Sequence, residues 1–123
     1  MPLESREVLG FWEGANIAFA KIKKMNTKFN FHIWDNQKND SITKTILSDL
    51  KYYNIDAIVA PFHTKEALLV SNYSKANKIP MFLAQNPSDV PAKSNPYAFK
   101  FHIPKNKMLY DYYRKIQQDI SYN

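Results

Sequence analysis

The sequence contains no cysteine and only two glycines in 123 residues. Without cysteine the chain cannot form a disulfide, a thiolate metal site or a cysteine nucleophile. The compartment stays open, because exported proteins can also lack cysteine. Both glycines, Gly10 and Gly14, fall inside a predicted helix, where each costs about 1 kcal/mol relative to alanine. We therefore expect another segment to approach the helix closely at these positions.

Long hydrophobic runs are also missing. No stretch has the length and apolar character of a membrane span, so no span is predicted. The N-terminal MPLESREV has no apolar signal core. These features predict either a cytoplasmic protein or a piece of an exported chain whose signal peptide was removed or lies outside it. The length of 123 residues predicts a single domain, residues 1–123, with a core of its own.

The formal net charge of +6 raises the question of nucleic-acid binding. The densest basic stretch, Lys21–Lys28, falls at the C-terminal end of the first predicted helix, where lysines complement the helix dipole. The other lysines are scattered, Arg6 and Arg114 are the only arginines, and no glycine-rich or aromatic RNA-binding motif is present. We therefore expect no nucleic-acid partner.

Helical and extended patterns alternate along the chain. The predicted helices are residues 5–25, a second from a cap at Asp40 or Ser41 to Asn54, a third capped by Thr64, and residues 105–120. The predicted strands are Phe29–Asp35, Ile58–Ala60, Pro80–Leu83 and Tyr97–Ile103. The alternation predicts a three-layer α/β fold with a mostly parallel sheet and helices on both faces. Such a sheet normally opens with a strand, so the first strand is expected to be missing or truncated.

The stretch DAIVAPFHT, residues 56–64, joins the central strand to the third helix. The apolar run Ile58–Ala60 predicts a strand that is buried on both faces. The helix behind it starts near Thr64, where N–H groups and the helix dipole favour a polar or anionic group. This junction is therefore a predicted ligand site.

Four segments of the chain resemble the type I periplasmic-binding-protein family, which includes branched-chain amino-acid-binding proteins and receptor ligand-binding regions. The segments are FWEGANIAFAKIKK, FHIWDNQKNDS, IDAIVAPFHTKEALLVSNYSKANKIPMFLAQNPSD and PYAFKFHIPKNKMLYDYYRKI. Together they cover about residues 9–118. The resemblance implies a flavodoxin-like lobe with strand order 2-1-3-4-5, and this chain would supply most of the N-terminal lobe of a two-lobed protein.

The resemblance also implies a site and a function. A small polar ligand of amino-acid-like character would lie between two lobes of the same parent protein in the periplasm or cell envelope. The implied ligand-binding residues are His63 and Thr64 after the third strand and Gln85 and Asn86 after the fourth. The sequence departs from the family pattern, because Ala60-Pro61 replaces Gly-Pro and only Thr64 remains of a hydroxyl pair.

Each candidate residue also has a purely structural interpretation. Thr64 can serve only as a helix cap, and His63 can be an exposed loop residue. Asn86 precedes a proline and can simply open a turn, with Gln85 beside it. Asp35 at the end of a predicted strand is expected to cap the following turn rather than to act in catalysis.

An enzymatic function is not predicted. The third strand ends without the carboxylate that a receiver domain requires, and no glycine-rich phosphate loop follows any strand. The three histidines are too far apart to suggest a metal site. We expect no catalytic residue, no metal and no cofactor. Two functions stay open: a ligand-binding lobe, or a protein interaction module of the bacterial envelope that has lost its ligand. The open sheet edge left by a missing strand also predicts a homodimer.

Overall fold

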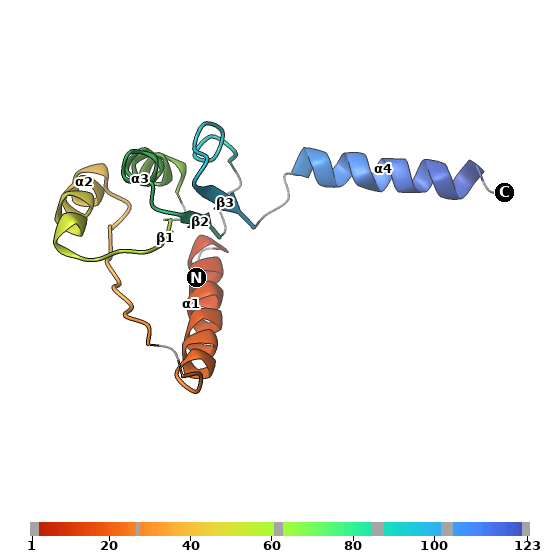
Figure 1. Cartoon of the computed structure of the whole chain (residues 1–123). Coiled ribbons are helices and arrows are strands. Elements are labelled where there is room, and N and C mark those ends of the chain that lie inside the picture. Colours follow the sequence, from red (N-terminus) through yellow and green to blue (C-terminus); the bar gives the residue numbers. More distant parts are fainter. Residues whose placement is uncertain (1–2, 27, 61–62, 85–87, 102–104, 122–123) are drawn as a thin grey trace. The chain divides into compact units, whose positions relative to one another are not determined.

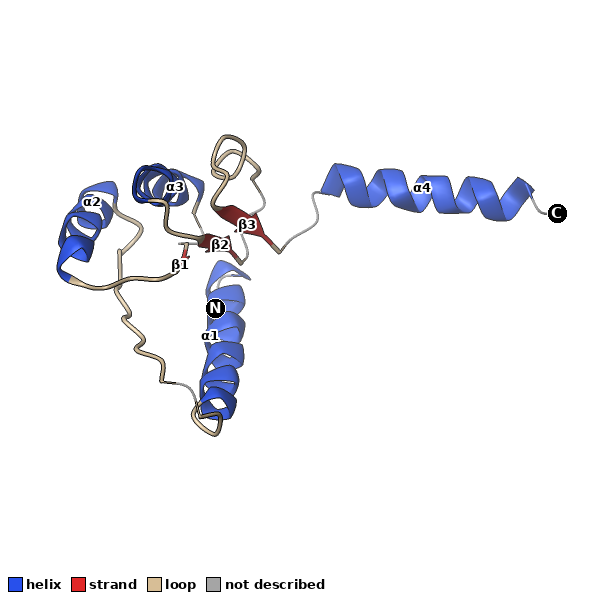
Figure 2. Cartoon of the chain, in the orientation of Figure 1, coloured by secondary structure: helices blue, strands red, loops and turns tan. Residues whose placement is uncertain are grey.

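The computed structural model describes residues 3–26, 28–60, 63–84, 88–101 and 105–121. The chain forms two compact units, Met1–Asp35 and Asn36–Asn123. The described residues form four α-helices, one 3₁₀ turn and three short strands, whose arrangement can be followed in Figures 1 and 2. The helices are α1 Leu3–Ile22, α2 Asp40–Asp49, the 3₁₀ turn η1 Leu50–Tyr52, α3 Thr64–Asn77 and α4 Lys105–Ser121. The strands are β1 Ile58–Val59, β2 Met81–Leu83 and β3 Ala98–Lys100.

All four predicted helices are confirmed, and three of the four predicted strands are found. The last helix agrees with its predicted range 105–120 to within one residue, and the second continues into η1 as expected near Tyr53. No helix in the described part of the chain combines the length and apolar character needed to cross a membrane.

The first unit contains α1 and differs from its prediction at the glycines. A Cβ added at Gly10 or Gly14 would meet no atom within 4 Å among the described residues. The first unit itself therefore provides no segment that approaches the helix closely at these positions. Both positions lie on the exposed surface of α1, so within the first unit the two glycines lower the helix propensity without a packing partner.

The segment Phe29–Asp35 follows α1, and its predicted strand is wrong. No part of it pairs with another strand among the described residues, although its apolar residues alternate as in a strand. The Phe31 ring instead stacks on the Phe29 ring, with centroids 6.0 Å apart, and lies 3.9 Å from the Phe19 ring of α1. Alternation reports β-propensity, but a strand also needs a neighbouring strand for its hydrogen bonds.

The second unit contains a parallel sheet with strand order β1-β2-β3. Val59 pairs with Phe82 and Phe82 pairs with Phe99, so these three side chains form one row across the sheet. The parallel pairing confirms the predicted α/β class, in the form of a partial fold with three strands among the described residues.

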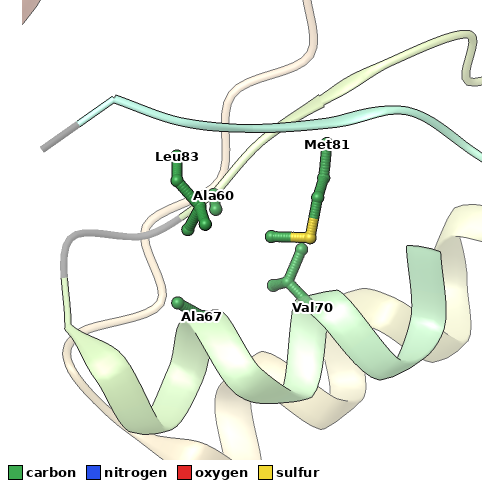
Figure 3. Packing of buried hydrophobic residues seen from close by; sticks show 5 residues of the cluster. All are labelled: Ala60, Ala67, Val70, Met81 and Leu83. Carbon is green, nitrogen blue, oxygen red and sulfur yellow. The ribbon is translucent and has the colours of Figure 1, made fainter. Parts of the chain in front are cut away.

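The hydrophobic core lies between α3 and one face of this sheet. Figure 3 shows Ala67 and Val70 of α3 facing Ala60, which follows β1, and two side chains of β2. The buried cluster consists of Ala60, Ala67, Val70, Met81 and Leu83. On the other face, Val59 is 56% exposed and Phe99 is 50% exposed. The prediction that the central strand is buried on both faces is therefore wrong for Val59.

A buried polar network joins α3 to the chain between β2 and β3. The Asn95 amide Nδ2 donates towards Ser71 O at 3.0 Å and towards the Oγ atoms of Ser71 and Ser74, each at 3.1 Å. The Asn95 Oδ1 accepts a hydrogen bond from the Tyr97 N–H at 2.9 Å. In addition, the Ser71 hydroxyl donates to the Pro91 carbonyl. One side chain thus fixes α3 and the approach to β3 together.

The cap of α2 lies one or two residues before its predicted position. Asn39, rather than Asp40 or Ser41, is the N-cap, and its Oδ1 accepts hydrogen bonds from Ser41 N at 2.8 Å and Ile42 N at 3.1 Å. Several consecutive residues of this turn could have capped the helix, and the extended backbone of Asn39 selects it.

We predict that Asn39→Ala lowers the free energy of unfolding by about 1 kcal/mol, because two N–H groups of the first turn lose their acceptor. Urea denaturation followed by circular dichroism measures this loss. Asn54→Ala at an exposed position is the matched control and should change stability by less than about 0.5 kcal/mol. Equal effects of the two substitutions would contradict the cap.

Candidate functional site

The parallel strands bring two connecting segments to the same edge of the sheet. The Ala60 N–H donates to Phe82 O at 2.9 Å at the end of β1. At the end of β2, Leu83 O accepts from Phe101 N at 3.4 Å. The chain therefore leaves β1 towards His63 and leaves β2 through Ala84 at one common edge, which we call the carboxyl edge.

The helix α3 begins at this edge, and its N-cap differs from the prediction. His63 is the N-cap residue, with φ −90° and ψ 139°, and Thr64 is the first helical residue. The predicted capping role of Thr64 is therefore wrong by one position. The His63 carbonyl accepts the first helical hydrogen bond, from Ala67 N at 2.9 Å. Its side chain makes no cap hydrogen bond, in contrast to the Asn39 side chain at the start of α2.

An uncapped helix start is chemically useful. The first N–H groups of a helix have no partner within the helix, and the dipole gives this end a partial positive charge. When the N-cap side chain does not accept from them, a ligand oxygen can take its place. His63 and Thr64 are both half-buried, so a ligand here would be partly shielded from water.

The predicted site residues are described only in part. Gln85 and Asn86 lie outside the described residues. Ala84, directly before them, is half-buried at the end of β2. The structure thus places His63 and Thr64 at the carboxyl edge, and the second predicted pair follows a strand that ends at this edge.

The sequence analysis missed one polar residue near this site. Glu66, in the first turn of α3, is only 5% exposed. Its Oε2 atom is buried and has no hydrogen-bond partner among the described residues. An acidic residue at a helix start is normally explained by the helix dipole. The burial of Glu66 could have been predicted from its spacing in the sequence, because Glu66, Val70 and Ser74 recur every four residues and share the buried face of α3.

These features define a class of protein, namely an α/β lobe with a parallel sheet and polar junctions at its carboxyl edge, where such folds bind small ligands. The comparison with protein families identifies the particular family. The family model described as the receptor family ligand-binding region matches residues 13–123. The chain belongs to this family, which is of the type I periplasmic-binding-protein kind.

The family match confirms the resemblance drawn from the four sequence segments and supports a ligand-binding lobe. The comparisons with curated proteins and with solved structures found no match.

Proposed function

We propose that the chain is the N-terminal, small-ligand-binding lobe of a two-lobed protein of the periplasm or cell envelope, and that it is not an enzyme. Residues 1–123 would form one α/β domain, and the second lobe of the same parent protein would cover the ligand. The observation that carries the proposal is the start of α3, which lies at the carboxyl edge without a side-chain cap in a chain of a ligand-binding family.

The proposed site consists of His63, Thr64, Gln85 and Asn86. The first-turn N–H groups of α3 would donate to a ligand oxygen, and the Thr64 hydroxyl would add one further hydrogen bond. The amide side chains of Gln85 and Asn86 offer both donors and acceptors, which suits a small polar ligand.

Thr64→Val tests this assignment, because valine keeps the shape of threonine and removes its hydroxyl. We expect a bound polar ligand to lose affinity about three- to tenfold, the effect of one hydrogen bond. The measurement is an NMR titration of the ¹⁵N-labelled chain with a library of small polar compounds, which detects even weak binding to a single lobe.

The matched control is Thr45→Val on α2, where the hydroxyl is exposed and donates only to Ser41 O at 3.1 Å. This variant should bind like the wild type. A library that shifts no amide near residues 63–66 or Ala84 would refute the proposed function. A ligand bound equally well by both variants would refute the role of Thr64.

A second candidate function is a protein interaction module of the bacterial envelope that has lost its ligand. The exposed aromatic rings on the sheet face opposite the core favour it: Phe99 and Phe101 stack on Phe82, with centroids 5.5 and 5.7 Å away. Exposed apolar patches often mark protein contacts, including those of a homodimer. NMR titrations in which no ligand shifts an amide signal, together with a dimer in light scattering, would favour this candidate over the ligand-binding lobe.

A further inference from the structure

No further inference is drawn: the strongest candidate, the aromatic surface patch that Phe82, Phe99 and Phe101 form on the sheet face opposite the core, carries none, because nothing in the described part of the structure shows what covers it.

Discussion

Replacing Asn95 by alanine is expected to lower the free energy of unfolding by about 3 kcal/mol. The side chain is buried, its Nδ2 donates to oxygens of Ser71 and Ser74, and its Oδ1 accepts from the Tyr97 N–H. Each of these bonds contributes about 1 kcal/mol, and truncation also leaves buried partners without a replacement. Because the bonds join α3 to the segment that leads into β3, we expect the loss to affect the cooperative unfolding of the second unit. Urea denaturation monitored by circular dichroism measures it.

A matched control is Asn77→Ala, at the exposed end of α3, where the amide donates only to Tyr73 O at 2.9 Å. Its effect should stay within about 0.5 kcal/mol. Asn95→Asp distinguishes the acceptor role of the amide from its donor role. It keeps an oxygen that can accept from the Tyr97 N–H, and it replaces the donating NH₂ group by a carboxylate oxygen next to the Ser71 carbonyl. We expect it to be as harmful as alanine. Stability close to wild type in either Asn95 variant would contradict the network.

The sequence predicted the class of the fold because most helices and strands of this chain are marked by local patterns of apolar residues. Apolar spacing located all four helices, and short β-branched or aromatic runs located β1, β2 and β3. The segment Phe29–Asp35 has the same local pattern but no strand ladder among the described residues. Pairing depends on a neighbour that is distant in sequence, so local pattern cannot decide it.

The sequence predicted where the candidate site lies, but it predicted the roles of single residues less well. Both helix caps were predicted too late in the chain, by one or two residues at Asp40 or Ser41 instead of Asn39 and by one residue at Thr64 instead of His63. In each turn neighbouring polar residues are chemically able to cap the helix, and the backbone conformation decides which of them is the N-cap residue. Glu66 was missed because charge suggests exposure, whereas the tertiary packing of α3 buries it.

Leu83→Ala is expected to cost about 3 kcal/mol of unfolding free energy. Leu83 is fully buried at the end of β2, and its side chain belongs to the same core cluster as Ala60 and Ala67, on the side of the sheet that faces α3 (Figure 3). These neighbours are already as small as a methyl group, so they cannot move their side chains into the cavity. Among the described residues the core cluster has only five buried members, and the loss therefore removes a large share of its contacts.

The control is Leu68→Ala, which makes the same change on α3 at a position that is 38% exposed, and it should cost less than about 1 kcal/mol. Leu83 also precedes Ala84 at the carboxyl edge, so a collapse around the cavity would move the base of the proposed ligand site. We therefore expect Leu83→Ala to weaken any ligand detected in the NMR titrations, whereas Leu68→Ala should not. If Leu83→Ala and Leu68→Ala have equal effects on stability, α3 does not pack on β2 as described.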